Sequence, residues 1–451
     1  MAATADPAPL AVAAPAAVPS LPPGPPLPRL VQAALILAAP ERFLRACRRR
    51  YGGAFTMRLL FGAPSVVISD PALLRAVFTG PPEVLRAGES NRFLEPLVGD
   101  RSVLLLDGAE HLRQRKLLLP PFHGRNVARY EEIAAEATRR VVAGWPIGTP
   151  FALLPAMQEI TLEVILRAVL GIEDEERRRR FSDLARATLA PIWVSPARLL
   201  FAALTGRWSP DRRRGQAFRT RIAALDAAVY AEVARRRADP ALAETDDVLA
   251  MLLRATDEEG TPLTDREVRD ELVTLLLAGH ETTATSLAWA FERLLRHPDA
   301  LARTTADVAA GSDRWLEAVT RETLRTRPII PAVGRILAEP WALDGHLLPA
   351  GTELSPSAVL VHFDEALYPD AQAFDPARFL DRTPDTYAWL PFGGGVRRCL
   401  GASFALMEMR VVLREVLSTV ELEPATARDE PVVRRGIVLA PAHRARVVRT
   451  A

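Results

Sequence analysis

Apolar side chains recur at three- and four-residue spacing over most of the chain after residue 40, the pattern of helices that bury one face. Shorter segments near residues 55–68 and 332–354 have a strand-like pattern, and the second contains the turn signal Asp344-Gly345. No repeat of fixed period and no linker divides the chain. The pattern therefore predicts one mainly α domain with a smaller β part. The clearest helices are expected over residues 130–144, 160–170, 217–237 and 401–417.

The N-terminal segment consists largely of Ala and Pro and contains no Lys or Arg. A secretory signal begins with positive charge and continues as an unbroken apolar run, whereas prolines interrupt this segment repeatedly. We therefore predict a disordered tail over residues 1–28 and a single domain over residues 29–451. The next apolar run, residues 30–39, is shorter than the roughly 20 residues that span a membrane. We expect a cytoplasmic protein without a transmembrane segment, in which this run makes at most a weak contact with a membrane surface.

A long apolar helix is predicted over about 32 residues, roughly 48 Å at the helical rise. Thr264 and Glu267 have the spacing of a capping box at its start, and His297-Pro298 ends it. A helix of this length and apolarity is expected to cross the core.

The centre of this helix carries a polar break, Gly279-His280-Glu281-Thr282. Glycine is unfavourable in a helix interior, and the Thr282 hydroxyl can bond the carbonyl of Ala278 four residues earlier. One interpretation is a helix kink with a solvated Glu281. The other is a pocket floor at which the small residues Ala278 and Gly279 make room for a flat cofactor or a ligand. The carboxyl and hydroxyl groups that follow would then relay protons into an apolar site.

Two cysteines are too few for a disulfide framework or a cysteine-rich metal cluster. Cys47 lies in a basic segment and is interpreted as incidental. Cys399 follows three glycines and two arginines and lies just before a predicted helix, whose N-terminus stabilises a thiolate. We therefore expect a lowered pKa for Cys399. Two roles stay open on these grounds: a nucleophile, although the loop holds no histidine base, or the axial ligand of a haem iron.

The charge sum of the chain is +2, and Lys116 is the only lysine, so nearly all of the positive charge is arginine. So balanced a charge does not favour nucleic-acid binding. The sequence contains no dinucleotide or flavin fingerprint. Electrons for redox chemistry would therefore come from another protein.

The cysteine loop resembles the signature Phe-x-x-Gly-x-Arg-x-Cys-x-Gly of the cytochrome P450 family, with matches at Phe392, Gly395, Arg397, Cys399 and Gly401. The resemblance extends over roughly residues 20 to 451. It implies a P450-type haem-thiolate domain that binds haem b (iron protoporphyrin IX), with Cys399 as the ligand of the iron. Phe392 and Gly401 are then expected beside the cofactor.

Glu322 and Arg325 resemble the Glu-x-x-Arg pair of the family's K helix, and their i, i+3 spacing lets them pair. Residues 374–379 are similar to the segment that adds a second arginine, here Arg378, to that pair. The resemblance implies a buried network of these three side chains that locks the Cys399 loop against the core.

The polar break in the long helix is similar to the oxygen-activating stretch of the family's I helix, which places Ala278 and Gly279 beside the haem. By the same resemblance, four basic side chains are expected to bond the haem propionates. His111 and Arg115, at i and i+4, correspond to the family's C helix, and the others are Arg335 and Arg397.

The resemblance implies a bacterial oxidoreductase, a monooxygenase that inserts one oxygen atom from O2 into a substrate, for example by hydroxylation. Glu281 and Thr282 match the family's catalytic acid–alcohol pair, and this pair argues against three alternatives. These are a peroxide-using haem-thiolate enzyme, a haem-thiolate isomerase or dehydratase, and a haem sensor or carrier without turnover. We expect a monomer that receives electrons from a ferredoxin or flavodoxin with its NAD(P)H-dependent reductase.

The expected substrate pocket is mostly apolar and has no clustered charge. This composition favours a lipophilic small molecule of terpene, fatty acid, steroid or polyketide type. By resemblance, the lining comes from four segments, represented by Phe93, Leu94, Leu97, Ile192, Trp193, Ala278, Ile330, Ala332 and Val333.

Overall fold

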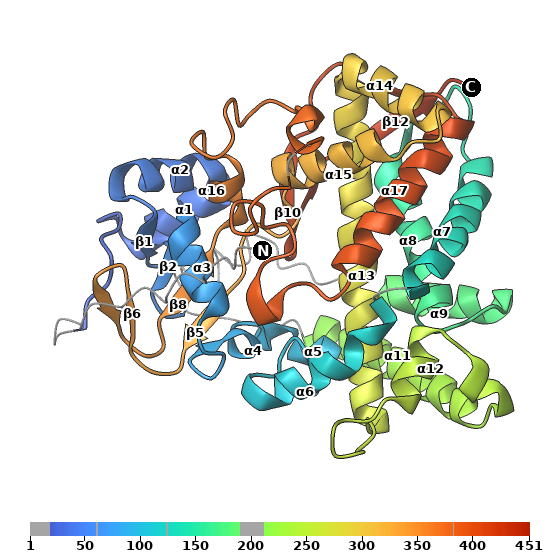
Figure 1. The fold of residues 1–451 in the computed structure, drawn as a ribbon, viewed down its shortest axis with the longest axis horizontal. Helices are drawn as coiled ribbons and strands as arrows, with labels where there is room; N and C mark the ends of the chain where they lie inside the picture. Colours follow the sequence, from blue (N-terminus) through green and yellow to red (C-terminus); the bar gives the residue numbers. More distant parts are fainter. Residues whose placement is uncertain (1–18, 60–61, 123–124, 190–211, 382) are drawn as a thin grey trace, which may run out of the picture.

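A helical part and a smaller β-rich part lie side by side in the computed structural model (Figure 1). The structure describes residues 19–59, 62–122, 125–189, 212–381 and 383–451. Helices make up 56% of the structure and strands 11%, which confirms the mainly α prediction. The helices are α1 (Arg29–Ala38), α2 (Pro40–Tyr51), α3 (Pro71–Thr79), α4 (Ala87–Ser90), α5 (Glu95–Val98), α6 (Gly108–Leu118), α7 (Arg125–Ala143), α8 (Leu153–Ala168), α9 (Glu175–Leu189), α11 (Arg212–Arg237), α12 (Val248–Arg254), α13 (Asp265–Arg296), α14 (Pro298–Ala309), α15 (Arg314–Thr326), α16 (Ala358–His362) and α17 (Ala402–Thr419).

The β part is built around one mixed sheet with the strand order β1-β2-β8-β5-β3. Strands β2 and β8 are parallel and the other neighbours in this sheet are antiparallel. A three-stranded sheet, β4-β12-β9, and two hairpins, β6-β7 and β10-β11, complete the described strands. The bounds are β1 (Ala54–Met57), β2 (Ser65–Ile68), β3 (Leu85–Arg86), β4 (Phe151–Ala152), β5 (Arg335–Leu337), β6 (Trp341–Leu343), β7 (His346–Leu348), β8 (Glu353–Pro356), β9 (Leu422–Pro424), β10 (Val432–Arg435), β11 (Val438–Pro441) and β12 (Arg446–Arg449).

The turn predicted at Asp344-Gly345 joins β6 to β7. Leu343 pairs with His346 across it. Asp344 has φ of 51° and Gly345 has φ of 73°, and two positive φ values suit the tight turns that connect antiparallel strands.

The chain joins the fold earlier than the predicted boundary at residue 28. Ser20 donates its N–H to Leu347 O at 2.9 Å, and Thr56 of β1 donates its N–H to Pro23 O at 3.1 Å. A Cβ on Gly24 would lie 1.9 Å from Thr56 O, so only glycine fits this close approach to β1. The segment just before α1 is therefore packed, and the expectation of a tail up to residue 28 is corrected there.

Helix α13 has the bounds that its terminal signals predict. Thr264 Oγ1 accepts the Glu267 N–H at 3.2 Å, and Glu267 Oε2 accepts the Thr264 N–H at 2.8 Å, which completes the capping box. The helix runs unbroken for 32 residues to Arg296. Figure 1 shows α13 as the long yellow helix through the helical part, where it packs against α8, α11, α15 and α17.

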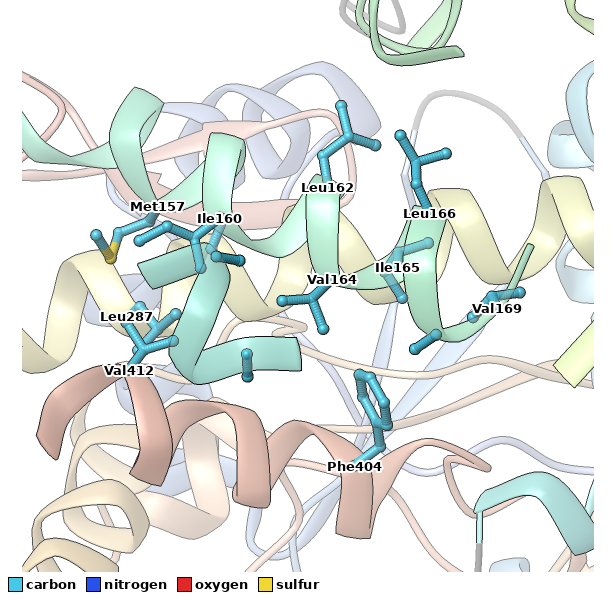
Figure 2. Close-up of a cluster of buried hydrophobic side chains, with 14 of the residues drawn as sticks. Met157, Ile160, Leu162, Val164, Ile165, Leu166, Val169, Leu287, Phe404 and Val412 are labelled. Atoms are coloured by element: carbon cyan, nitrogen blue, oxygen red, sulfur yellow. The ribbon is translucent and has the colours of Figure 1, made fainter. Parts of the chain in front are cut away.

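The main core forms where α8, α13 and α17 meet. Figure 2 shows Met157 and Ile160 of α8 near Leu287 of α13, with Val412 of α17 beside it. All four side chains are fully buried. Burial of each such side chain contributes roughly 1.5–3 kcal/mol. This packing fixes the polar centre of α13 relative to the start of α17. No helix within the described ranges is both long and apolar enough to cross a membrane.

Candidate active site

The loop before α17 is held in one shape by its own backbone and by α3. Cys399 donates its N–H to Phe392 O at 3.0 Å, which closes the loop. Gly395 has φ of 61°, and a Cβ there would lie 1.8 Å from Phe78 O. Only glycine satisfies both the left-handed backbone and this close contact. Gly401 is the N-cap residue of α17, so Cys399 lies two residues before the helix N-terminus.

Cys399 is an exposed residue, although protein atoms surround its sulfur. Burial raises its pKa above the ordinary value. A hydrogen bond from the Gly401 N–H and the positive charges of Arg115 and Arg398 act in the opposite direction without offsetting burial. The expectation of a lowered pKa is therefore wrong for the protein alone. Loss of hydration at the enclosed sulfur outweighs the nearby arginines and the helix terminus.

One residue at the polar break of α13 is exposed, next to residues that are buried. Ala278 is exposed, whereas Leu276, His280 and Thr283 are buried. The Thr282 hydroxyl donates to Ala278 O at 2.5 Å, as the sequence suggested. The open side of the helix therefore carries Ala278, with the Thr282 hydroxyl one turn further on.

Gly279 lies next to α8. A Cβ on Gly279 would lie 2.7 Å from Cδ1 of Ile165 on α8, so its small size suits the approach of α8 to α13. Its place beside a cofactor stays a prediction. Of the two small residues, Ala278 alone is exposed.

Glu281 is held by a side chain that the sequence analysis missed. Gln158 of α8 donates its Nε2–H to Glu281 Oε2 at 2.6 Å. Burial raises the pKa of Glu281, while the Gln158 hydrogen bond and the positive charge of Arg435 act against that rise. Gln158 and Glu281 are 123 positions apart, so no local pattern could have linked them. The carboxyl group is half-buried and is therefore not the freely solvated group of a simple kink.

The neighbouring His280 is a neutral, buried side chain. Burial lowers its pKa to about 4, and the positive charge of Arg186 adds to this effect. Its Nδ1 lies 3.9 Å from Glu281 Oε2. Thr161 of α8 donates its hydroxyl to His280 O at 3.1 Å. Helix α8 therefore contacts the polar break of α13 at two successive residues.

Three predicted propionate partners, Arg115, Arg335 and Arg397, form a largely buried cationic cluster around a fourth, His111. His111 of α6 and Arg335 of β5 are 1% and 6% exposed. Burial and the charges of the three arginines together lower the pKa of His111 to about 3, so its ring is neutral. Burial also lowers the pKa of Arg335 and of Arg397 to about 10, with mutual repulsion adding to the effect at Arg335. So much buried positive charge is stable only with an anion beside it.

Asp107 is the carboxylate that the structure places beside this cluster, and the sequence did not indicate it. Asp107 Oδ1 lies 2.5 Å from Arg397 Nη2. The same carboxylate accepts the N–H groups of Gly88 and Glu89 at 2.8 and 3.0 Å. Arg397 also donates to Val103 O at 3.1 Å and to Leu106 O. One carboxylate and two carbonyls thus hold the Arg397 guanidinium. In the described part of the chain, Nδ1 of His111 is buried without a hydrogen-bond partner.

Glu322 and Arg325 of α15 form a fully buried, bidentate pair. Arg325 donates Nε–H and Nη2–H to the two Glu322 oxygens, each at 2.7 Å. Both side chains are 0% exposed. The remaining N–H groups of Arg325 reach the carbonyls of His362, Ala371 and Ala373 at 2.7–2.9 Å. Each donor is thus satisfied, as a buried charge requires.

Arg378 joins this pair at its outer side. Its Nε lies 3.6 Å from Glu322 Oε1, beyond hydrogen-bond distance. Its two Nη groups donate to Pro369 O at 2.5 Å and Asp370 O at 2.8 Å. The structure therefore brings the three network residues together. Arg378 donates hydrogen bonds to backbone carbonyls, and the closest contact between opposite charges is that of Glu322 with Arg325.

The residues expected to line a substrate pocket are dispersed in the structure. Phe93 is 63% exposed, and its place in a substrate pocket stays a prediction. Leu94 and Leu97 are buried in the main core. The segment containing Ile330, Ala332 and Val333 is half-buried. Ile192 and Trp193 lie outside the described residues.

Comparisons with known proteins agree with this geometry. A family model described as Cytochrome P450 matches residues 21–447. The chain is 47% identical over 435 residues to cytochrome P450 135B1 of Mycobacterium tuberculosis, covering 95% of this chain and 91% of that protein. It is 42% identical over 452 residues to cytochrome P450 138 of the same species, covering 99% and 98%.

Two solved structures extend the likeness to three dimensions. The cyanobacterial CYP120A1 with bound retinoic acid has a TM-score of 0.79 at 25% identity, and the match covers 96% of this chain and 99% of that one. The heme domain of cytochrome P450DA has a TM-score of 0.80 at 22% identity, with 95% and 97% covered.

The chain belongs to the cytochrome P450 family. Its members bind haem b, and the protein is a monooxygenase of this haem-thiolate class. The two mycobacterial relatives and CYP120A1 are bacterial.

Proposed function

We propose that the protein inserts one oxygen atom from O2 into a lipophilic small molecule, with haem b held by Cys399. The observation that carries this proposal is the juxtaposition of an open cysteine thiol with a buried cationic cluster. Arg115 belongs to that cluster, and its charge acts on the Cys399 sulfur, so the two features share one site. A dianionic, flat cofactor matches both.

The residues present fit a haem. Cys399 would bind the iron, and Phe392, Gly401 and Ala278 would lie beside the macrocycle. His111, Arg115, Arg335 and Arg397 would hold the propionates, whose negative charge would offset the buried positive charge. The buried, unpartnered Nδ1 of His111 marks one point at which an acceptor is missing from the described protein atoms. When bound, the haem supplies O2 binding and electron acceptance.

The chain's own residues would move protons and exclude water. The Thr282 hydroxyl lies beside the exposed Ala278, where it can hold a water or a proton donor near the cofactor. Glu281 is half-buried and next in the chain, so it would connect this hydroxyl to solvent. Since burial raises its pKa, Glu281 takes up a proton more readily than an exposed carboxylate.

A lipophilic substrate is supported by the apolar character of the expected lining. Ile330 packs against the main core and Val333 packs against the core of the β part. The related CYP120A1 has retinoic acid bound, which is an isoprenoid acid of the same physical class. We propose a terpene, fatty acid, steroid or polyketide type of substrate, oxidised for example by hydroxylation.

We further propose a monomeric cytoplasmic protein that receives electrons from a ferredoxin or flavodoxin and its NAD(P)H-dependent reductase. Arg398 of the cysteine loop is exposed and offers a cationic contact to an acidic partner.

The decisive experiment reconstitutes the haem-loaded protein with a ferredoxin, its reductase and NAD(P)H, and screens a lipophilic panel for a low- to high-spin Soret shift. We expect turnover that depends on NAD(P)H and both redox proteins. Turnover without an electron source would instead identify an isomerase or dehydratase, and turnover with hydrogen peroxide alone would identify a peroxide-using enzyme. Binding without turnover would identify a haem sensor or carrier.

A further inference from the structure

His362 ends α16 in the space between α15 and the cysteine loop, and it was not indicated by the sequence. Its side chain is 0% exposed. Arg325 donates Nη1–H to the His362 carbonyl at 2.7 Å, and His362 Nδ1 lies 3.1 Å from the Arg325 carbonyl. The two residues therefore contact each other twice, once through each backbone carbonyl.

The other ring nitrogen faces the cysteine loop. Leu390 donates its backbone N–H to His362 Nε2 at 2.8 Å. A backbone N–H can only donate, so Nε2 carries no proton and Nδ1 must be the protonated nitrogen. Nδ1–H then donates to the Arg325 carbonyl. The hydrogen bonds thus assign one tautomer of a neutral ring. Burial and the positive charge of Arg325 lower the pKa of His362 to about 3, which keeps the ring neutral.

The cysteine loop begins at Leu390. Its carbonyl accepts the Gly393 N–H at 3.1 Å, and the Phe392 carbonyl accepts the Cys399 N–H at 3.0 Å. The Leu390 N–H is used by His362, so both polar backbone groups of Leu390 are engaged. A shift of Leu390 would move the carbonyl that closes the loop around Cys399.

The two preceding residues are held separately. Tyr368 donates its hydroxyl to Ala388 O at 2.9 Å, and Trp389 donates its indole N–H to Arg321 O at 3.2 Å. Neither hydrogen bond is made to the Glu322–Arg325 pair, although the Arg325 guanidinium lies over the Tyr368 ring, 4.9 Å from its centroid. The ring of His362 accepts a hydrogen bond from Leu390 and makes one to the Arg325 carbonyl, and so links the two segments directly.

We propose that His362 is a positioning residue: Arg325 holds its backbone carbonyl, and its side chain accepts the Leu390 N–H and so holds the start of the Cys399 loop in the geometry that binds haem iron. The inference rests on the proposed ligation of haem by Cys399. It assigns to a single imidazole the coupling between the buried ion pair and the cysteine ligand.

The test uses the haem-loaded full chain and two substitutions that keep different halves of the imidazole. His362→Gln places a side-chain oxygen near the Nε2 position and can still accept from Leu390. His362→Asn keeps a donor near the Nδ1 position and loses the bond to Leu390. Thr326→Val is the matched control. Thr326 of α15 is buried, as His362 is, and its hydroxyl donates to Glu322 O at 2.8 Å but makes no bond to the cysteine loop.

The readouts are the ferrous–CO spectrum, which separates thiolate from thiol ligation, and the rate of haem transfer to apomyoglobin. We expect His362→Asn to lose most of the thiolate-type band and to release haem about tenfold faster, the effect of one lost buried hydrogen bond. His362→Gln and Thr326→Val should keep the band. Equal spectra and haem release for the Asn, Gln and Val variants would overturn the proposal.

Two further outcomes are also decisive. If His362→Asn does not accumulate as folded protein, His362→Gln decides alone: a thiolate fraction equal to that of Thr326→Val supports the proposal, and a fraction far below it overturns the proposal. A wild-type protein without the thiolate band refutes the ligation by Cys399 on which the inference rests. That result is distinct from a His362 variant that behaves as the wild type does.

Discussion

Gln158 of α8 donates its amide N–H to Oε2 of Glu281 on α13 at a distance of 2.6 Å. Burial raises the pKa of Glu281, and this hydrogen bond is the largest influence that lowers it. The amide therefore both orients the carboxyl group and limits how strongly it holds a proton. In the proposed relay, Gln158 sets the pH range over which Glu281 can deliver protons.

Replacing Gln158 with Leu should move the pH profile of coupled turnover to higher pH. The lost hydrogen bond favours the ionised form, so its removal raises the pKa of Glu281 further. The measurement is the product formed per NAD(P)H consumed across the pH range. Glu159→Gln, an exposed change at the next position of α8, is the control and should leave the profile in place. A Gln158→Leu profile that coincides with the control would contradict the role of Glu281 in the relay.

Replacing Thr282 with Ala should uncouple electron use from product formation. The hydroxyl bonds Ala278 O at the open position of α13, so its loss removes a polar group from the site without changing the helix. We expect unchanged substrate binding, a product yield per NAD(P)H lower by about tenfold or more, and release of hydrogen peroxide. Ser286→Ala removes the same kind of hydroxyl one turn later, where Ser286 donates to Thr282 O at 2.8 Å. If both variants couple equally well, the assignment of Thr282 fails.

Glu271 of α13 is a buried carboxyl group outside the proposed catalytic residues. Its Oε1 accepts the Val103 N–H at 2.6 Å and the Gln114 Nε2–H at 3.1 Å. Burial raises its pKa to about 8, and the two hydrogen bonds only partly oppose this rise. Both bonds go to the same oxygen, so a glutamine at this position can accept them with its carbonyl.

The raised pKa predicts that stability falls as the pH rises from the ordinary glutamate value, about 4.3, towards 8. In this interval the folded chain holds a proton that the unfolded chain has released. The free energy of unfolding therefore falls by up to about 1.4 kcal/mol for each pH unit. Glu271→Gln lacks this proton and should lose less stability between pH 5 and pH 8. Thermal unfolding of the haem-loaded proteins at both pH values checks the difference. Parallel pH dependence in wild type and variant would show that Glu271 ionises normally.

Features encoded by neighbouring residues could be predicted from the sequence. The capping box of Thr264 and Glu267 and the stop at His297 fix both ends of α13, because each depends on contacts within one turn of the helix. The Thr282 hydrogen bond to Ala278 follows from the same local geometry. For these elements, side chains and backbone four residues apart determine the structure.

Features made by distant segments could not be predicted. Asp107, Gln158 and His362 reach their partners across 290, 123 and 28 positions, and each is an ordinary polar residue in its own local sequence. The contact of Gly279 with Ile165 of α8 could not be predicted for the same reason, since the approach of α8 is set by core packing rather than by the helix itself. The pKa of Cys399 depends on enclosure by several elements, which a motif cannot convey.

The central claim is that Cys399 binds the haem iron as a thiolate. The most direct measurement is the ferrous–CO absorption spectrum of the wild-type protein and of Cys399→Ser, with Cys47→Ser as the control at the buried second cysteine. We expect the red-shifted thiolate-type band in the wild type and in Cys47→Ser, and its complete loss in Cys399→Ser. A thiolate-type band that persists in Cys399→Ser would contradict this claim.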